Sequence, residues 1–426
     1  MSAPNRVYYD VENTLHVPFI SGIQRVVRQL SAVLTDHEEN AFEFIPVVYC
    51  EHCNSWRCLS KTELIRLRRH SFEPLKKHIP FNKVHLLASR ILSKQAKKYL
   101  RLLYDRHSHP DWHHQLLLSR FEPGSIFLDI DASWHNSLKR HILLPHLKSI
   151  GVYIAVIHYD IIPVLFPDMT NKSTYPIFTQ HLRAHIENAD LFICISRNSE
   201  RDLIEYARRE YPNREIHTTT IQLGANNFGS GHNIVSIPPY LRDRKYLLCV
   251  GTIEPRKNHR LILDAFDQLS DKYPMIVLVF VGREGWNSSE TIDRILRNRH
   301  INHRLYWLSD VNDDTLSSLY RHALLTVVPS LYEGFGLPVT EALMYGCPTL
   351  SSDRGALREA GGTFVDYFNP EDTHAFTALL KSYLDGYKAE QSIIMLRSYV
   401  PPDWNTTANQ LLDALNQNFF LETKLE

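Results

Sequence analysis

The chain has 426 residues, which is more than a single hydrophobic core normally accommodates, so we expect two domains. Lys and Arg together number 47, as do Asp and Glu, and this balance argues against a globally basic nucleic-acid-binding protein. No apolar run reaches the roughly 18–20 residues of a membrane span, and the 6 cysteines do not suggest a disulfide framework. We therefore expect a cytoplasmic protein.

Apolar runs separated by helical segments mark the first half of the chain. A helix is expected at about 23–34. The expected strands, in chain order, are 7–9, 44–49, 125–128, 152–157, 191–195 and 219–223. Continuous apolar runs of this kind are typical of a parallel sheet that is buried on both faces.

A basic segment at about 61–106 interrupts the first half. Lys and Arg far outnumber Asp and Glu there, and apolar residues recur at helical spacing, as at Leu87 and Ile91. A basic amphipathic hairpin suits an anionic membrane surface. A solvated helical insertion that packs on its own sheet explains the pattern equally well. The segment therefore affects which partners the protein binds rather than which reaction it catalyses.

Strands and helices alternate again in the second half of the chain. The expected strands are 246–251, 276–282, 304–308, 324–328, 348–351 and 362–365. This alternation predicts an α/β protein with two doubly wound, Rossmann-like domains that face a central cleft. We place the domains and their connections at 1–228 (first domain), 229–244 (linker), 245–400 (second domain) and 401–426 (C-terminal helix).

A glycine-rich stretch at 329–336, here called the glycine loop, follows the expected strand 324–328. Pro338 suits the first position of a helix, and Gly346 suits the residue just past its end. The exposed N–H groups of such a helix start favour a phosphate. Carboxylates repel phosphates, so Glu333 and Glu341 are better suited to accept hydrogen bonds from sugar hydroxyls. Phosphate and polyol together suggest a nucleotide-sugar.

A second loop, 251–258, also follows a strand and precedes a helix. It begins with Gly251 and carries Arg256 and Lys257, which are placed where two cations could neutralise a diphosphate. Adjacent basic residues on loops are usually just solvated. Their position after a strand, upstream of Glu333 in the same domain, favours the functional interpretation.

Together, segments 251–258 and 333–341 resemble the donor-site signatures of GT-B glycosyltransferases of family 4, also called group 1. The two glutamates show the family's spacing, with seven residues between them. The resemblance is firm from about 246 to 365 and weaker in the first half. It implies a GT-B fold in which the last helix crosses back to the first domain, which would bind the acceptor.

The resemblance also implies roles for individual residues. Arg256 and Lys257 would bind the donor diphosphate, Glu333 the hydroxyls of the transferred sugar, and Glu341 the ribose. The backbone N–H groups that would face phosphate and sugar belong to Gly334, Phe335, Gly336 and Leu337. The stretch from Ser309 to Val311 occupies the position of the family's nucleobase pocket.

Two motifs of the first half match the family only in part. Gly22 opens a helix, where it could let a phosphate or acceptor approach closely. It resembles the family's first glycine loop, although Ser21 replaces the usual second glycine and ordinary helix capping explains Gly22 as well. The family often shows His-Asp-x-x-Pro at the end of the strand 152–157. Here Asp160 matches, but Tyr159 replaces that histidine and His158 lies one residue earlier. All three are candidate catalytic residues, and Asp160 is favoured.

Metal-ligand spacing occurs once, at Cys50, His52, Cys53 and Cys58, where free thiols near a strand end are the preferred interpretation. The only Asp-x-Asp sequence, at 129–131, ends a strand of the first half, away from the donor motifs. We therefore predict no metal site and no cofactor beyond the donor substrate.

The resemblance implies a retaining transferase that adds a sugar to a growing bacterial surface glycan such as O-antigen. The position of the Asp-x-Asp sequence predicts that this transferase is metal-independent. GDP-mannose is the first choice of donor, and the acceptor would be a glycan or a lipid-linked glycan. The protein could work at the inner face of the membrane or in a glycan assembly complex. Two alternatives remain open: a nucleotide-sugar epimerase or hydrolase with the same fold, and a non-catalytic, transferase-like scaffold.

Overall fold

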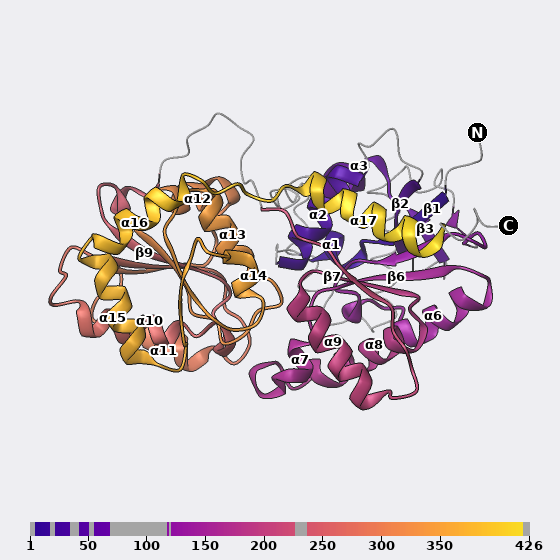
Figure 1. Ribbon diagram of the computed structural model, residues 1–426, viewed down its shortest axis with the longest axis horizontal. Helices are drawn as coiled ribbons and strands as arrows, with labels where there is room; N and C mark the ends of the chain where they lie inside the picture. The colour runs from indigo at the N-terminus through magenta and orange to yellow at the C-terminus, as the bar shows by residue number, and fades with distance from the viewer. Residues whose placement is uncertain are drawn as a thin grey trace, which may run out of the picture.

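The computed structural model of the protein describes residues 5–17, 22–34, 42–50, 55–68, 117–118, 121–225 and 237–420. Within these residues the chain forms two domains, each built on a largely parallel sheet with helices packed against it (Figure 1). The basic segment from residue 69 onward and the part of the predicted linker up to residue 236 lie outside the described residues. The same is true of His52 and Cys53.

The first sheet contains the parallel strands of the first domain and a short antiparallel edge. Its order is β4 (Leu117–Leu118), β3 (Ser55–Cys58), β2 (Phe42–Cys50), β1 (Asn5–Asp10), β5 (Ile126–Asp129), β6 (Tyr153–His158), β7 (Leu191–Cys194) and β8 (Thr218–Thr220). Successive residues of a strand enter opposite cores: Tyr9 packs on one face of the sheet and Tyr8 on the other. Burial of both faces explains the continuous apolar runs of the sequence.

Helices connect the strands of the first domain. They are α1 (Glu12–His16), α2 (Gly22–Leu34), α3 (Lys61–Arg68), η2 (Ser133–His135), α6 (Arg140–Ser149), α7 (Ile162–Leu165), η3 (Pro167–Met169), α8 (Thr174–Asn188) and α9 (Arg197–Glu210). α9 begins at the carboxyl end of β7, where Ser196 caps it by accepting a hydrogen bond from the backbone N–H of Ser199.

The second sheet is parallel throughout its described length. Its order is β11 (Leu305–Leu308), β10 (Val277–Val281), β9 (Tyr246–Val250), β12 (Leu325–Val328), β13 (Thr349–Ser352) and β14 (Asp366–Phe368). Its helices are η4 (Pro239–Leu241), η5 (Pro255–Lys257), α10 (His259–Leu269), α11 (Ser289–Leu296), α12 (Asp313–His322), α13 (Leu337–Met344), α14 (Leu357–Gly361), α15 (Thr373–Leu384) and α16 (Tyr387–Leu396). The order changes direction at β9 and β12, the place where ligands bind in open α/β sheets.

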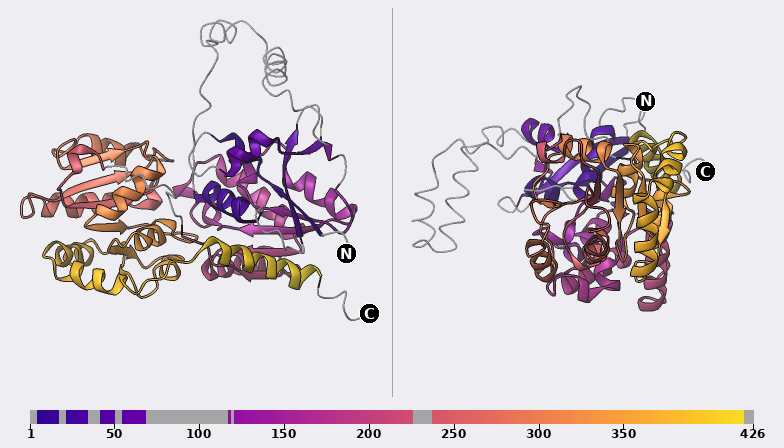
Figure 2. Two further views of the ribbon diagram at one scale, coloured as in Figure 1. Left: turned by 90° about the horizontal axis from the view of Figure 1, so that it is seen from above. Right: turned by 90° about the vertical axis from the view of Figure 1, so that its left-hand side faces the viewer.

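The last helix, α17 (Trp404–Phe419), leaves the second domain and packs on the first (Figures 1 and 2). Trp404, Leu411 and Leu415 belong to the same buried cluster as side chains of α2 and β7. A Cβ atom on Gly224 would lie 2.7 Å from the Trp404 backbone nitrogen, so glycine is what lets the helix start approach this closely. The tryptophan therefore has a packing role.

One predicted strand is wrong. Residues 362–365 form a turn after α14, and the strand of this region, β14, begins only at Asp366. Gly362 adopts a positive φ of 53° where α14 ends, a conformation that interrupts an extended chain. Among the described residues, no helix combines the length and the apolar character that a membrane span requires.

Candidate active site

The glycine loop lies at the carboxyl end of β12, and α13 follows it directly. Gly336, the residue before α13, has a φ of 118°, which an L side chain rarely adopts. A Cβ atom there would also come within 2.8 Å of Leu357. The loop is tied to its own domain by backbone hydrogen bonds, since Leu331 N–H donates to the Arg256 carbonyl and Ala356 N–H to the Glu333 carbonyl.

Glu333 is buried in a cluster of hydrogen-bond donors that come from both loops. Its carboxylate lies 2.9 Å from Arg256 Nη1, 2.5 Å from Lys257 Nζ and 2.6 Å from the hydroxyl of Ser330. Burial alone would raise the pKa of this carboxyl group, but the charges of Arg256 and Lys257 outweigh that effect and lower the pKa to about 2. Glu254 forms a second ion pair with Arg256, at 2.7 Å.

This ion pairing changes the separate roles that the sequence predicted for the cations and for Glu333. We expected the cations to face a diphosphate and Glu333 to face sugar hydroxyls. In the structure Glu333 neutralises Arg256 and Lys257 directly. A diphosphate that binds both cations would therefore compete with the Glu333 carboxylate. Once the diphosphate has displaced Glu333 from Arg256 and Lys257, the carboxylate would be free to accept hydrogen bonds from sugar hydroxyl groups.

Glu341 is also buried, four residues into α13. The hydroxyl of Tyr320, from α12, donates to Glu341 Oε2 at 3.0 Å. Burial and the nearby Glu341 charge raise the pKa of Tyr320, so the tyrosine stays protonated as a donor. Glu341 is thus bound by a side chain of α12 rather than by the groups that bind Glu333.

The predicted base-binding stretch and the predicted glycines Gly22 and Gly251 lie in three separate parts of the chain. Ser309 is exposed and Val311 half-buried in the connection from β11 to α12. Gly22 opens α2, and a Cβ atom on it would make ordinary contact with Leu337, at 3.6 Å. Gly251, with a φ of 152°, faces the aliphatic part of Lys257. Gly22 and Leu337 are thus brought together across the two domains.

The three candidates at the end of β6 point in different directions. The His158 ring packs in an edge-to-face arrangement on Phe192, and burial lowers its pKa to about 3. The Tyr159 hydroxyl donates to the Ile130 carbonyl at 2.7 Å. Asp160 faces the glycine loop: a Cβ atom on Gly334 would lie 2.8 Å from Asp160 Oδ2. Asp160 is therefore the one of the three that the fold brings to Glu333 and Arg256.

The electrostatics agree with this placement of Asp160. Burial raises the pKa of its carboxyl group, while a hydrogen bond from the Ile162 N–H and the charge of Arg256 act in the opposite direction. The negative charge of Glu333 also raises the pKa of Asp160. Asp160 of the first domain is thus influenced by Arg256 and Glu333 of the second, in agreement with its contact with Gly334.

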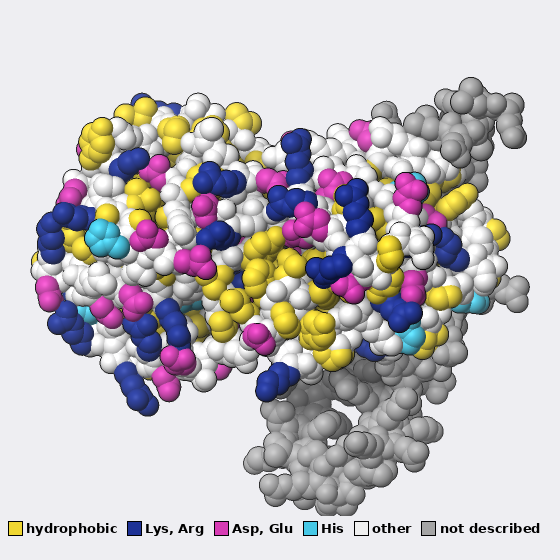
Figure 3. All heavy atoms as spheres, turned by 60° about the horizontal axis from the view of Figure 1, so that its bottom comes forward, with side chains coloured by type: hydrophobic (Ala, Val, Ile, Leu, Met, Phe, Trp, Pro, Cys, Tyr) yellow, Lys and Arg dark blue, Asp and Glu magenta, His cyan; other side chains and the backbone are white. Residues whose placement is uncertain are grey.

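Sequence reasoning missed a group of residues that hold the two domains together at this site. They are Ser196, Asn198, Ser199, Asp202, Tyr332 and Glu359. The signal that could have found the first of them is a polar turn at the carboxyl end of a buried strand, β7, which is where ligand-facing loops start. Figure 3 shows charged and hydrophobic side chains along the junction of the two domains.

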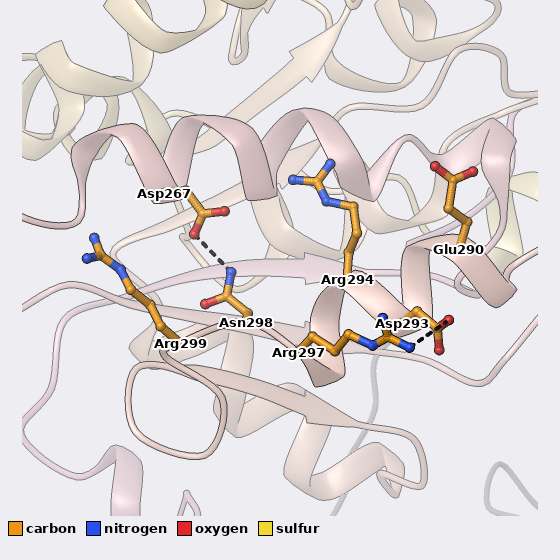
Figure 4. Close-up of a pocket in the computed structure, with 7 residues that line it drawn as sticks. All are labelled: Asp267, Glu290, Asp293, Arg294, Arg297, Asn298 and Arg299. Carbon is orange, nitrogen blue, oxygen red and sulfur yellow. Dashed lines mark hydrogen bonds and ion pairs between the residues drawn. The ribbon is translucent and has the colours of Figure 1, made fainter.

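A surface pocket lies elsewhere on the second domain (Figure 4). Charged and amide side chains of α10, α11 and the following loop line it: Asp267, Glu290, Asp293, Arg294, Arg297, Asn298 and Arg299. Two pairs among them already satisfy one another, Asp293 with Arg297 and Asp267 with Asn298. The candidate site contributes no side chain to it. The described residues also include no group of three or more His, Cys, Asp or Glu that could hold a metal ion.

Known proteins resemble this chain in sequence. Residues 237–395 match the family model described as glycosyl transferases group 1. The serotype-specific mannosyltransferase WbdA of Escherichia coli is 26% identical over 278 residues, which are 63% of this chain and 34% of WbdA. O-antigen chain mannosyltransferase B of Escherichia coli is 30% identical over 238 residues, 53% of this chain and 60% of that protein. The chain thus spans about a third of one relative and less than two thirds of the other.

Solved structures resemble almost the whole chain. Sucrose-phosphate synthase from Thermosynechococcus elongatus has a TM-score of 0.61 at 16% identity and covers 97% of this chain and 99% of its own. Anabaena HepE, solved in complex with UDP and glucose, has a TM-score of 0.61 at 13% identity and covers 97% and 100%. The protein has the GT-B fold. Its segment 237–395 resembles the group 1 glycosyl transferases.

Proposed function

We propose that the protein is a glycosyltransferase that moves a sugar, with mannose from GDP-mannose as the first candidate, onto a growing bacterial surface glycan. The observation that carries the proposal is the convergence of Arg256, Lys257 and Glu333 of the second domain with Asp160 of the first. Relatives named as mannosyltransferases of O-antigen chains support the choice of sugar and acceptor.

The residues divide the chemistry as follows. When the sugar–phosphate bond breaks, negative charge develops on the departing nucleoside diphosphate. Arg256, Lys257 and the N-terminus of α13 are fixed beforehand to stabilise that charge. Glu333, displaced from the cations by the diphosphate, accepts hydrogen bonds from sugar hydroxyls. Asp160 lies against Gly334 of the glycine loop and orients the acceptor or supports the reacting sugar.

We further propose that transfer retains the anomeric configuration and uses no resident metal or cofactor. Two cations and a helix N-terminus supply the charge stabilisation that a metal would otherwise provide. NMR of the product made from an α-linked donor tests the stereochemistry, since an inverted product contradicts retention. Transfer that survives dialysis against EDTA supports metal independence, and loss of transfer that Mg²⁺ restores contradicts it.

The central test uses Lys257→Ala, with Lys388→Ala as its control. Lys388 lies in α16 of the same domain and pairs with Asp366, so the control removes the same charge away from the site. We expect Lys257→Ala to lower kcat by about 10²–10³-fold, because a group that stabilises the leaving charge is gone. The control should keep wild-type activity. Full activity in both Lys257→Ala and Glu333→Ala would refute the assignment.

The same assay separates the alternatives. Incubation with GDP-mannose alone, without a glycan, yields an altered sugar if the protein is an epimerase or hydrolase. A panel of GDP, UDP, dTDP and their common sugars in a thermal-shift assay tests binding. Stabilisation by one nucleotide-sugar identifies the donor, whereas the absence of any shift favours a non-catalytic scaffold.

A further inference from the structure

The first turn of α9 touches the glycine loop of the other domain. The Ser196 hydroxyl lies 2.7 Å from the Gly334 carbonyl oxygen. The Ser199 hydroxyl lies 2.7 Å from the Tyr159 carbonyl oxygen and 3.0 Å from that of Gly334. Both serines are buried. Two hydroxyl groups thus join the backbone just before Asp160 to the backbone just after Glu333.

Gly334 makes this approach possible. A Cβ atom at this position would lie 2.8 Å from both the Tyr159 carbonyl oxygen and Asp160 Oδ2, and 2.9 Å from Asp160 Cβ. These three nearest atoms all belong to the first domain, so the missing side chain serves contact between the domains. Any larger residue would hold the glycine loop away from Asp160.

A second link meets the same turn from α14. Glu359 accepts hydrogen bonds from the backbone N–H groups of Arg197 and Asn198, each at 2.8 Å. The first N–H groups of a helix have no partner within the helix, and the helix dipole favours an anion there. The carboxylate of one domain therefore completes the start of a 14-residue helix of the other.

A third link comes from the glycine loop itself. The Tyr332 hydroxyl accepts a hydrogen bond from Asn198 Nδ2 at 2.8 Å and donates to Asp202. Its ring also packs on Phe166 of the first domain, at 5.1 Å between ring centres. Tyr332 directly precedes Glu333 in the chain, so the contact fixes the backbone from which the Glu333 side chain extends.

We infer that the first turn of α9, residues 196–199, together with Glu359, positions the two halves of the active site for transfer. The inference rests on the proposed function. Sugar transfer requires the donor groups and Asp160 to be held in one geometry, and a small misplacement of reacting groups is costly. The α9 turn is the part of the first domain that contacts both Tyr159 and Gly334. Ser196, Ser199 and Glu359 are thus positioning residues, not groups that touch the substrate.

The test compares Glu359→Ala with Glu371→Ala. Both glutamates are exposed residues of the second domain, but Glu371 pairs with Arg354 of its own domain. We expect Glu359→Ala to lower kcat roughly 10- to 100-fold. The KM for the donor should stay within about twofold, because the charged groups proposed to bind the donor, Arg256, Lys257 and Glu333, lie in the second domain. Glu359→Gln, which keeps one acceptor oxygen, should give an intermediate kcat.

A second measurement is independent of activity. Small-angle X-ray scattering of the ligand-free protein should show a larger radius of gyration for Gly334→Ala and Glu359→Ala than for wild type and Glu371→Ala. An unchanged kcat in Glu359→Ala, or unchanged scattering in Gly334→Ala, overturns the inference. If wild type transfers no sugar at all, the proposed function fails, and the scattering comparison still decides whether the α9 turn holds the domains together.

Discussion

Replacing Glu333 by Gln removes one negative charge from between Arg256 and Lys257 and keeps the side chain nearly the same size. The side chains of this cluster are only 10–16% exposed, so solvent screens their interaction little. The substitution removes the ion pair of Lys257, while Arg256 keeps its ion pair with Glu254 and the more distant charge of Asp160. We therefore expect the ligand-free variant to be destabilised.

The size of the effect follows from the pKa of Glu333. Its decrease from 4.5 to about 2 means that the fold favours the charged over the neutral carboxyl group. At 1.36 kcal/mol for each pKa unit, this preference amounts to about 3 kcal/mol. For a domain of roughly 150–250 residues, a loss of that size lowers Tm by roughly 6–12 °C.

The pH dependence has a definite sign. Because the pKa of Glu333 is lower in the folded than in the unfolded chain, its stabilisation is fully present above pH 4.5 and is lost as the pH falls toward 2. The stability difference between wild type and Glu333→Gln should be about 3 kcal/mol at pH 7 and about half that at pH 3. Added nucleoside diphosphate should reduce the difference at pH 7, because its phosphates replace the missing carboxylate.

Urea unfolding followed by circular dichroism at pH 7, 5 and 3 measures these differences. Glu371→Gln serves as the control, since its ion pair with Arg354 lies at the surface and should contribute less than about 1 kcal/mol. Equal stability of wild type and Glu333→Gln at pH 7 would refute the reasoning. So would a difference that does not shrink as the pH falls.

Two further substitutions test the fold of the first domain. Arg140 is buried between Asp10 and Asp129 and forms ion pairs with both. Arg140→Ala should therefore leave two buried carboxylates without their cation and lower the free energy of unfolding, measured in urea, by about 3–5 kcal/mol. Arg183→Ala, which removes an exposed arginine, should have little effect on that free energy. Trp404→Ala should cost roughly 3–5 kcal/mol by leaving a cavity where α17 meets the first domain, and a change below 1 kcal/mol would contradict this packing role.

Local sequence features predicted much of the fold, because local physical chemistry decides them. Apolar runs located the ends of the buried strands β1, β6 and β9 to within two residues, since a strand buried on both faces forms a continuous apolar run. Pro338 predicted the start of α13 to within one residue, since the helix begins at Leu337. The strand expected at 362–365 was wrong because the positive φ of Gly362 belongs to a helix end, which apolar content alone does not reveal.

The sequence also predicted some features of the candidate site and not others. The sequence by itself identified Arg256, Lys257, Glu333 and Glu341 as candidates, since their loops carry glycine and helix-start signals a few residues away. It favoured Asp160 over His158 and Tyr159 but could not tell which way the three side chains point, because the direction of a side chain at a strand end depends on what packs there.

Only the tertiary structure decided how these parts meet. It paired Glu333 with both cations, turned His158 toward Phe192, and placed Asp160 against Gly334. It also revealed the α9 turn, whose contacts join residues more than 130 positions apart in the chain. Residues that are close in sequence determine helices, strands and turns. Contacts between the domains form only when both domains have folded and packed against one another.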